Sequence, residues 1–574
     1  MIKKILYFFN KKQKKYLLLL FSFMFFATIL EMVGLGFVFS IVGSLGSENS
    51  SNLLIDKASV FFNLDKINIL SYLLLAFLIF YIIKISFLIF YNWFESNFLY
   101  SYAENLSSRV FKEYLNQNFS FFYNRNSSEF IRNLITEVNQ FTLYLLSVLK
   151  LALEIIILIG IFFILAYVNL YFTTLVTLIF LFFSCLYFFL LKEKLNLWGK
   201  QRQAYIQKRI QFMQEGFDGI KIIKLLGREN FFFNKFKFYN VNLSTVAMKS
   251  HFFQGMPRLL FELVGISFAT FSLFFLYYSG KNLIEITQIL SIYVVASFRI
   301  LPSINRIVSS LQYMKLSYPA MDVLYKELKS FKENFQSSYE SFAFNKSISV
   351  DIKKFKYPSS INFQISNVKF DIAKGQKIGI IGSTGSGKST VIEILLGIAE
   401  PPIGSITVDG KSIYTNIKGW QKLIGFVPQK IFILDDSFRN NILFGLDKKI
   451  YTDDKILLMI KKLSLGNLLN RLPNGLEGNL GEEGINLSGG EIQRIGLCRA
   501  LIYDPEVIFL DEATSSLDID TETQILDELK IFKKKTIISI AHRINTLKNC
   551  DKIYKFDNGK IVDEGNFDKF KRKN

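Results

Sequence analysis

The chain has 574 residues, of which 50% are hydrophobic and 16% aromatic, and its mean hydropathy is +0.28. This length is too great for a single hydrophobic core, and this hydropathy is high for a soluble protein, so we expect several domains with at least one in a membrane. The formal net charge of +20 raises nucleic acid as a partner class. The three cysteines, Cys185, Cys498 and Cys550, have neither paired nor metal-like spacing, so the sequence predicts no disulfide framework and no zinc site.

Six segments of the first 310 residues are apolar and long enough to cross a bilayer, which takes roughly 20 residues of helix. Lysines precede the first segment as they would in a signal peptide. That run is too long and lacks a small-residue cleavage pattern, so we expect it to be retained. Six such runs argue against the alternative that these helices are buried in a large soluble core. The predicted spans are 16–43, 69–92, 141–168, 170–191, 255–278 and 283–308.

The distribution of basic residues predicts how these spans are oriented. The first fifteen residues hold six lysines and residues 192–254 hold twelve lysines or arginines, whereas 166–171 hold none and 279–284 hold one. Because cytoplasmic loops carry the excess of lysine and arginine, both chain ends are predicted to be cytoplasmic. The positive charge is then explained by topology, and no nucleic-acid partner is expected. We predict a multi-pass protein of the cell's inner (cytoplasmic) membrane.

The cytoplasmic connections at 93–140 and 192–254 are long for structureless loops and carry helical spacing. We therefore expect the helices to continue beyond the membrane, turn near 118–126 and 215–228, and return. The external segment 44–68 is mildly amphipathic, which suits a helix lying along the membrane surface.

A second kind of sequence begins near residue 348, where short β-rich runs alternate with helical ones. The runs KIGII at 377–381 and VIFLD at 507–511 are continuous apolar strands, typical of a sheet that is covered on both faces. We predict a membrane domain over 1–330, a polar linker over 331–347, and an α/β domain over 348–574.

The string GSTGSGKST follows the first of these strands and precedes a helical run. In that context glycines let backbone N–H groups curl around phosphate oxygens, and the helix N-terminus adds favourable polarity. The lysine then reaches the β and γ phosphates, and the serine after it ligates Mg²⁺. A glycine-rich structural turn is the alternative, but the length of the match argues against it. The predicted nucleotide-binding residues are Gly382, Ser383, Thr384, Gly385, Ser386, Gly387, Lys388, Ser389 and Thr390.

Two carboxylates, Asp511 and Glu512, end the second apolar strand. We predict that Asp511 holds Mg²⁺, directly or through water, and that Glu512 orients and deprotonates the attacking water, because phosphoryl transfer depends mostly on positioning and charge neutralisation. Two adjacent acids that only keep a strand end soluble are the alternative. The phosphate loop upstream argues for the catalytic interpretation.

A second glycine-rich helix start, LSGGEIQR at 487–494, makes the pattern specific. With it, residues 348–574 resemble the nucleotide-binding domain of ATP-binding-cassette (ABC) transporters. The resemblance implies ATP and Mg²⁺ as cofactors and an ATPase coupled to transport. It also implies further site residues: the adenine-stacking Tyr357, the magnesium-contacting and coupling Gln429, the signature residues Ser488, Gly489 and Gly490 for the partner's γ-phosphate, the dimer-contact Asp518, and the catalytic switch His542.

Two positions depart from the family pattern. The signature ends in Glu491 rather than the commoner glutamine, and the loop at 515–518 reads SSLD rather than SALD. A carboxylate in the first turn of a helix is favoured by the dipole, but it brings negative charge towards ATP, so we expect altered affinity rather than lost activity.

The family resemblance also predicts the assembly and the fold. One chain has one phosphate loop and one signature, and the family sandwiches ATP between the loop of one subunit and the signature of the other. A homodimer with two equivalent sites is therefore expected, closing on ATP and acting on the membrane helices through the cytoplasmic turns. The predicted fold joins six transmembrane helices of the type I ABC exporter kind to an α/β P-loop NTPase domain.

Three arginines lie in or beside the last two predicted spans: Arg258, Arg299 and Arg306. Arg299 and Arg306 are seven residues apart and share one helix face. Structural roles that involve no cargo are the alternative, because Arg306 could extend to the interface and Arg258 could pair with Glu262 one turn away. Charged groups inside a membrane cost roughly 2.5–3.5 kcal/mol each, however, and usually face a cavity.

The strings GMPRLLFELVG and SFRILPSINRI that contain these arginines resemble helices of bacterial flippases that move lipid-linked oligosaccharides for protein N-glycosylation. The segment around 47–63 resembles their small external helix. The resemblance implies that the three arginines engage a lipid-linked diphosphate, a role that suits fixed cations in a low-dielectric cavity.

We therefore expect an ATP-driven exporter or flippase that moves a polyprenyl diphosphate-linked glycan from the inner to the outer leaflet. Export of another amphipathic cargo, such as a glycolipid, peptide or drug, is the alternative within this class. An ATP-gated channel or regulatory protein on the same fold is a second alternative. A DNA-repair ATPase has a related nucleotide domain, but six spans argue against it.

Overall fold

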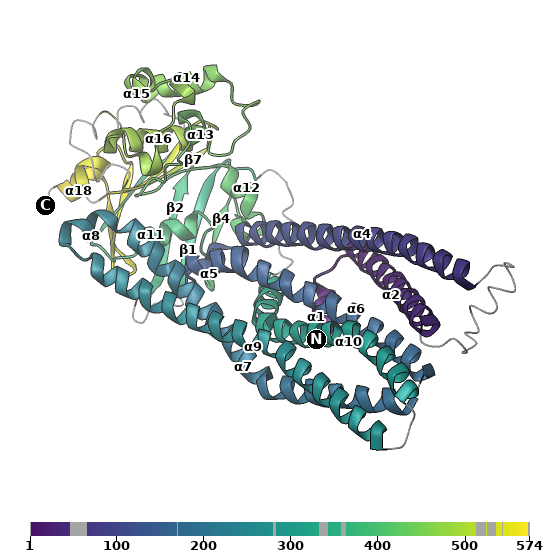
Figure 1. Cartoon of the computed structure of the whole chain (residues 1–574). Coiled ribbons are helices and arrows are strands. Elements are labelled where there is room, and N and C mark those ends of the chain that lie inside the picture. The colour runs from purple at the N-terminus through teal and green to yellow at the C-terminus, as the bar shows by residue number, and fades with distance from the viewer. Residues whose placement is uncertain are drawn as a thin grey trace. The chain divides into compact units, whose positions relative to one another are not determined.

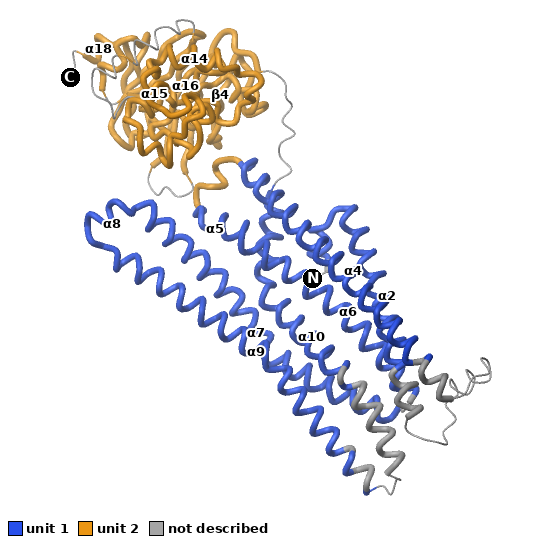
Figure 2. Tube along the Cα trace, turned by 45° about the horizontal axis from the view of Figure 1, so that its top comes forward, with its two compact units in different colours: residues 1–117, 125–333 blue, residues 118–124, 334–574 orange. Residues whose placement is uncertain are grey.

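The structure is a computed structural model. It divides into two compact units, one formed by residues 1–117 and 125–333 and the other by residues 118–124 and 334–574. Figure 2 colours the two units separately. The residues described are 2–45, 66–168, 170–278, 283–331, 342–357, 363–512, 524, 535–541 and 543–571.

Unit 1 is built from long helices. The chain begins with a short helix. Most of the later helices are longer than the roughly 20 residues of a membrane span, which confirms the prediction that helices extend beyond the membrane. Figure 1 shows α7 and α9 running side by side, with the short α8 where they turn. The helices are α1 (Ile2–Tyr7), α2 (Lys11–Leu45), α4 (Lys66–Leu115), α5 (Ser127–Arg132), α6 (Val138–Val168), α7 (Leu170–Asp218), α8 (Ile220–Leu226), α9 (Glu229–Tyr278) and α10 (Leu283–Ser330), with a π-helical turn at Asn133–Glu137.

Four segments among the described residues are long and apolar enough to cross a membrane, and they overlap the first four predicted spans. They are Lys11–Phe37, Leu74–Leu115, Ser127–Tyr167 and Leu170–Asp218. The predicted fifth and sixth spans fall in α9 and α10, where part of the side chains lie outside the described residues. Most of the predicted external segment 44–68 also lies outside them, as does most of the linker.

Contacts between α7, α9 and α10 show why a proline is tolerated inside a helix. Pro257 has no N–H to donate, which frees the carbonyl of Phe253 four residues earlier in α9. Tyr187 of α7 donates its hydroxyl to that carbonyl oxygen at 2.6 Å, and the Gln312 side chain of α10 donates at 3.0 Å. At Gly199 of α7 a Cβ would lie 2.3 Å from a backbone carbonyl oxygen of α10, so only glycine fits. The three helices therefore approach closely near Arg258.

The described residues of unit 2 form two sheets. The first is antiparallel, with the order β2-β1-β4-β5, and the second is largely parallel, with the order β10-β9-β3-β8-β7-β6. Both predicted apolar strands are present, as β3 and β7. The strands are β1 (Ser347–Phe355), β2 (Ile365–Ala373), β3 (Lys377–Gly382), β4 (Ile403–Val408), β5 (Lys411–Ser412), β6 (Ile424–Val427), β7 (Val507–Asp511), β8 (Thr536–Ile540), β9 (Lys552–Asp557) and β10 (Lys560–Gly565).

The second sheet separates two hydrophobic cores, because Val507 and Phe509 of β7 belong to one core while Ile508 and Leu510 belong to the other. One core packs the antiparallel sheet against β3 and the helix that follows it, and contains the fully buried Trp420. The other lies among β6, β7 and the helices of residues 438–502. The helices of unit 2 are α11 (Lys388–Leu395), α12 (Ile417–Lys422), α13 (Phe438–Leu443), α14 (Asp453–Lys462), α15 (Gly466–Arg471), α16 (Gly489–Leu501) and α18 (Phe567–Lys571).

Candidate functional site

The phosphate loop joins β3 to α11 and depends on its glycines. Gly382 and Gly387 have φ values of 155° and 103°, which disfavour residues with a side chain. A Cβ at Gly382 would lie 2.3 Å from the carbonyl oxygen of Phe556, and one at Gly387 would lie 2.5 Å from Ile365. The strand, tight turn and helix start thus form the structure that the sequence motif predicts, with backbone N–H groups at the turn.

Lys388 lies at the first position of α11 and is 5% exposed. Its Nζ donates to the carbonyl oxygens of Gly382 and Ser383 at 2.9 and 3.0 Å, so the ammonium lies against the loop. Burial lowers the pKa of Lys388, while the negative charges of Glu512 and Asp511 oppose that shift. The loop and the strand-end carboxylates therefore share one electrostatic environment.

The carboxylates follow from the sheet order. β7 lies beside β8, and β8 lies beside β3, all parallel, so their carboxyl ends meet at one edge. There Gln429, from the loop after β6, donates through Nε2 to Glu512 Oε2 at 2.5 Å. Glu512 is 8% exposed, has a φ of 51°, and donates its backbone N–H to the carbonyl of Ile540 at 3.2 Å. A non-glycine residue in this region costs about 1–2 kcal/mol, which the surrounding bonds offset.

Asp511 provides a test of whether the site suits a cation. Its Oδ1 is buried with no hydrogen-bond partner. Burial and the nearby charges of Glu512 and Glu393 raise the pKa of Asp511 to about 6, although Lys388 lowers it. A buried, unsatisfied carboxylate beside another carboxylate gains most from a bound cation. Oxygen donors of this kind fit Mg²⁺, and Asp511, Ser389 and Gln429 are the residues that would hold it.

The predicted adenine-stacking Tyr357 lies just after β1 and is half-buried. Its hydroxyl donates to Glu393 Oε2 of α11 at 2.5 Å. Its ring contacts Tyr123 edge to face, with centroids 5.2 Å apart. Burial and the charge of Glu393 raise the pKa of Tyr123 to about 12. Residues 118–124, a predicted turn of the membrane domain, therefore pack in unit 2 beside the tyrosine that would bind adenine.

The signature residues begin α16. Ser488 is the N-cap, and Gly489 and Gly490 are the first two helical residues. Ser488 and Gly489 are exposed, as a surface for a second subunit requires. Two predicted site residues, Asp518 and His542, lie outside the described residues.

In unit 1, Arg299 belongs to a charge cluster that the sequence analysis did not identify. Its Nη2 lies 3.0 Å from Glu31 Oε1 of α2, and Nζ of Lys84 in α4 lies 3.0 Å from Oε2 of the same carboxylate. Lys84 also lies over the ring of Tyr81, 4.6 Å from its centroid. We call Glu31, Lys84 and Arg299 the membrane charge cluster. It holds two cations and one anion; the signal that could have revealed it was the single charge inside each of the first two spans.

The other two arginines differ from Arg299. Arg306 forms an ion pair with Glu154 of α6, whose side chain is 5% exposed. Arg258 is exposed and forms no ion pair with a described residue, so the suggested pairing with Glu262 is absent from the structure. The three arginines therefore do not form a single cluster. Arg299 shares an acid with Lys84, Arg306 has a separate acid, and Arg258 has none among the described residues.

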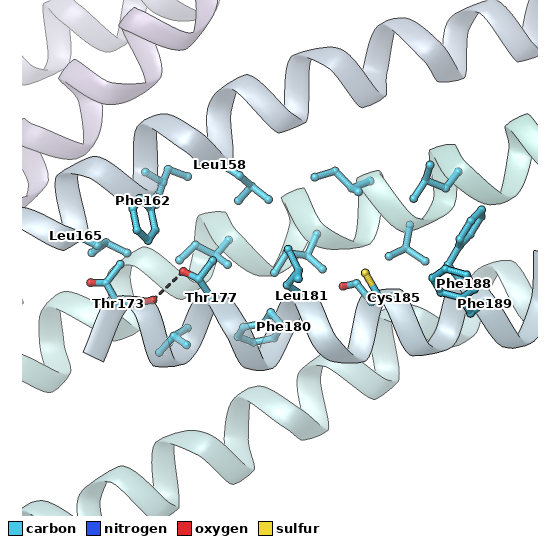
Figure 3. Close-up of a pocket in the computed structure, with 18 residues that line it drawn as sticks. Leu158, Phe162, Leu165, Thr173, Thr177, Phe180, Leu181, Cys185, Phe188 and Phe189 are labelled. Carbon is cyan, nitrogen blue, oxygen red and sulfur yellow. Dashed lines mark hydrogen bonds between the residues drawn. The ribbon is translucent and has the colours of Figure 1, made fainter. Parts of the chain in front are cut away.

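An apolar cavity of about 270 Å³ lies between α6, α7 and α10. Figure 3 shows side chains of α6 and α7 pointing into it, among them Phe162, Phe180 and Cys185. The α10 residues on its wall include Ile300 and Ile307, each adjacent in sequence to one of the arginines. One helix thus provides both an apolar wall and the cations.

The comparisons with known proteins agree with this geometry. The ABC transporter transmembrane region matches residues 16–301, and the ABC transporter domain matches residues 365–515. A Rickettsia bellii protein named as an export ATP-binding/permease protein is 39% identical over 224 residues, 38% of each chain. An ATP-dependent lipid A-core flippase of Aliivibrio fischeri is 28% identical over 375 residues, 64% of this chain and 63% of the relative.

These alignments cover less than two thirds of the length of each relative. Among solved structures, a bacterial Atm1-family ABC exporter with ATP bound has a TM-score of 0.81, covering 98% of this chain and 97% of the other at 19% identity. That likeness concerns the fold, which is the predicted exporter fold. From its two matched regions and its fold, the chain belongs to the ABC transporter family, with an exporter-type transmembrane domain joined to a nucleotide-binding domain.

Proposed function

We propose that unit 2 binds and hydrolyses ATP with the residues gathered at the edge of the second sheet. The loop of residues 382–390 holds the phosphates, and Lys388, released from the loop carbonyls, neutralises their charge. Glu512 accepts the proton of the attacking water, and its bond from Gln429 fixes its orientation. When bound, Mg²⁺ stabilises negative charge on the phosphates.

Two copies of the chain form the working unit in this proposal. The support is the exposure of Ser488 and Gly489 at the start of α16, while the phosphate loop lies at the start of α11. Each signature would then meet the ATP of the partner subunit, and His542 and Asp518 would complete the contact. The result is a homodimer with two equivalent sites, in the cell's inner membrane with unit 2 in the cytoplasm.

Residues 118–124 would connect ATP binding to the membrane helices. They pack with residues 334–574 through contacts such as Tyr123 with Tyr357, and the chain continues from them into α4 and α5. A change at the adenine platform therefore acts directly on two helices of unit 1. This provides a covalent path between the nucleotide and the membrane domain.

For the cargo, we propose a polyprenyl diphosphate-linked oligosaccharide moved from the inner to the outer leaflet. The observation that carries this proposal is the excess positive charge of the membrane charge cluster, whose Arg299 belongs to α10, a helix that also lines the apolar cavity. Arg299 lies 16 residues after the start of its predicted span and Lys84 lies 15 residues after the start of its own. At 1.5 Å per residue both are about 22–24 Å from the external end.

The physical fit concerns both ends of the cargo. A diphosphate is stabilised by fixed cations in a low-dielectric site. Arg258, which pairs with no acid among the described residues, provides a further cation. A long apolar chain suits the cavity wall formed by α6, α7 and α10. The relative named as a lipid A-core flippase supports a lipid cargo in general. Another amphipath with an anionic head remains the second candidate, because the cluster recognises charge rather than a particular glycan.

The cargo experiment uses purified protein in liposomes with a fluorescent polyprenyl diphosphate-linked glycan and ATP. Transfer is measured as exposure of the glycan to an impermeant quencher. We expect Arg299→Ala to reduce transfer at least fivefold and to remove the stimulation of ATP turnover by cargo, because the cluster loses its excess cation. The fold should survive this change, since Lys84 still neutralises Glu31.

The matched control is Arg209→Ala, which removes a half-buried arginine of α7 that donates to Asn240. It should transfer cargo at the wild-type rate. Wild-type transfer by Arg299→Ala would show that this arginine is structural and that the cargo is recognised elsewhere. ATP turnover without any transfer of lipid would favour a regulatory or channel role.

A further inference from the structure

Glu491 stands where the family signature commonly has glutamine, and its carboxylate holds the serine that the signature would present to ATP. The Ser488 hydroxyl donates to Glu491 Oε2 at 3.0 Å, and the Ser488 backbone N–H donates to the same oxygen at 2.8 Å. In return the backbone N–H of Glu491 donates to Ser488 Oγ at 3.3 Å. These bonds form a capping box at the first turn of α16, where a carboxylate is also favoured by the helix dipole.

The same bonds conflict with the role of the signature. A hydroxyl has one proton to donate, and here the Ser488 proton goes to Glu491 rather than outward to a phosphate. A carboxylate only accepts hydrogen bonds and carries negative charge, so it also repels a triphosphate, which a glutamine amide does not. A signature with Glu491 therefore needs a group that holds the carboxylate and cancels its charge.

Arg471 has the position and chemistry for this task. It is the last residue of α15, and its Nη2 donates to Oε1 and Oε2 of Glu491 at 3.0 and 3.2 Å and to the carbonyl oxygen of Asn486 at 3.3 Å. The Glu491 side chain is 17% exposed and the Arg471 side chain 58%. Burial raises the pKa of Glu491, but the hydrogen bonds from Ser488 and Arg471 outweigh burial and hold that pKa below its usual value. Glu491 is therefore an anion at neutral pH, with Arg471 as its counter-ion.

We propose that Arg471 is a positioning residue for the signature: it neutralises Glu491 and retains it when the partner subunit's ATP draws the Ser488 hydroxyl away. The proposal rests on the proposed function, from which it takes the pairing of the signature with the partner's ATP. The step is an exchange of hydrogen bonds. The Ser488 O–H leaves Oε2 for a γ-phosphate oxygen, while Arg471 keeps both carboxylate oxygens. An arginine 20 residues upstream thus compensates for the glutamate.

The test compares four full-length proteins in lipid nanodiscs: wild type, Arg471→Gln, Glu491→Gln and the double variant. We expect Arg471→Gln to raise KM for MgATP roughly tenfold and to change kcat less than about threefold, because the carboxylate of Glu491, without its counter-ion, repels the nucleotide. The double variant should return KM to within about twofold of wild type, since the amide has no charge to neutralise. The increase in Arg471→Gln should shrink at about 0.5 M salt, which screens exposed charges.

Controls separate charge from folding. Lys552→Gln removes one positive charge and the ion pair with Glu564 from the same unit, and it should leave KM unchanged. Arg471→Lys keeps the charge and should raise KM less than Arg471→Gln does. If Arg471→Gln lowers the thermal unfolding midpoint, the salt dependence and the Arg471→Lys variant still decide between charge and folding.

Two results would overturn the inference: a wild-type KM for Arg471→Gln, or a double variant whose KM stays raised. Wild-type protein that does not hydrolyse ATP would instead contradict the proposed function. The two failures are therefore distinguishable in one set of measurements.

Discussion

The nucleotide site of unit 2 and the membrane charge cluster of unit 1 treat buried charge in opposite ways. At the nucleotide site, Asp511 has a buried oxygen without a partner and a raised pKa, so the site keeps an unsatisfied anion where a cation would bind. In unit 1, the buried acids Glu154 and Glu327 each have an arginine partner, and Glu31 has two cations. A charge surrounded by lipid has no water to stabilise it, so it must be paired within the chain. In unit 2, the carboxylate of Asp511 can remain without a partner until a ligand binds, because that unit lies outside the lipid.

This comparison teaches which substitutions should disturb chemistry and which should disturb folding. Removing a group from the nucleotide site takes away function and spares or improves stability. Removing one member of a membrane ion pair leaves an uncompensated charge, which costs stability unless a second cation remains.

The largest effect is expected for Glu512→Gln. An amide keeps the shape of the side chain but cannot accept the proton of the attacking water, so ATP turnover should fall by at least about 100-fold. Phosphate release from proteoliposomes measures this. Glu506→Gln, which removes the acid that pairs with Lys374 in the same unit, is the control and should hydrolyse ATP normally. Unchanged turnover in Glu512→Gln would refute the catalytic role.

Arg306→Ala tests whether an ion pair in unit 1 stabilises the fold. It leaves Glu154 buried without a cation, so the free energy of unfolding should fall by about 2–3 kcal/mol. This is below the roughly 3–5 kcal/mol of a fully buried pair, because the Arg306 side chain is 42% exposed. Thermal unfolding in detergent measures the change. The double variant Glu154→Gln with Arg306→Gln should recover most of the loss, and a double variant as unstable as the single one would contradict the ion-pair account.

Tyr357→Ala tests the adenine platform. Loss of base stacking costs about 1–3 kcal/mol, so KM for ATP should rise by roughly tenfold. Tyr357→Phe keeps the ring and loses only the hydrogen bond to Glu393, so its KM should rise less than about threefold. Equal effects of the two substitutions would mean that the hydroxyl rather than the ring binds the nucleotide.

Asp511→Asn should have the smallest effect, and it should increase the stability of the folded protein rather than decrease it. Burial and Glu512 raise the pKa of Asp511 to about 6, so the folded protein holds a proton that the unfolded chain releases near its ordinary value of 3.8. Stability from this group is present at pH 4 and is lost as the pH rises through 6. At pH 7.5, without nucleotide, Asp511→Asn should be more stable than wild type by about 1–2 kcal/mol after allowance for partial exposure. The difference should vanish near pH 4; a constant difference would exclude titration of Asp511.

Local features of the sequence were sufficient for much of this fold and site. The apolar runs of β3 and β7, the glycines of the phosphate loop, and the long helices of unit 1 are contiguous patterns. Each depends on neighbours within a few residues. The family resemblance then pointed to Ser488 and Gln429, which unit 2 places at a helix start and beside Glu512.

Contacts between distant residues could not be predicted in the same way. Glu31 and Lys84 are 53 residues apart, and their pairing with Arg299 depends on how three helices pack. Arg471 and Glu491 meet only because α15 and α16 are adjacent in space. The sequence analysis identified Arg299 as costly and Glu491 as unusual, but a single sequence does not reveal which charges meet.

The most direct test of the central claim compares two cargoes that differ only in charge. Wild-type proteoliposomes receive ATP and either a polyprenyl diphosphate-linked glycan or the same glycan and chain joined by an uncharged linkage. We expect transfer of the diphosphate to be at least about tenfold faster, because the excess cation of the membrane charge cluster stabilises its negative charge. Equal ATP-driven transfer of the two lipids would contradict the account.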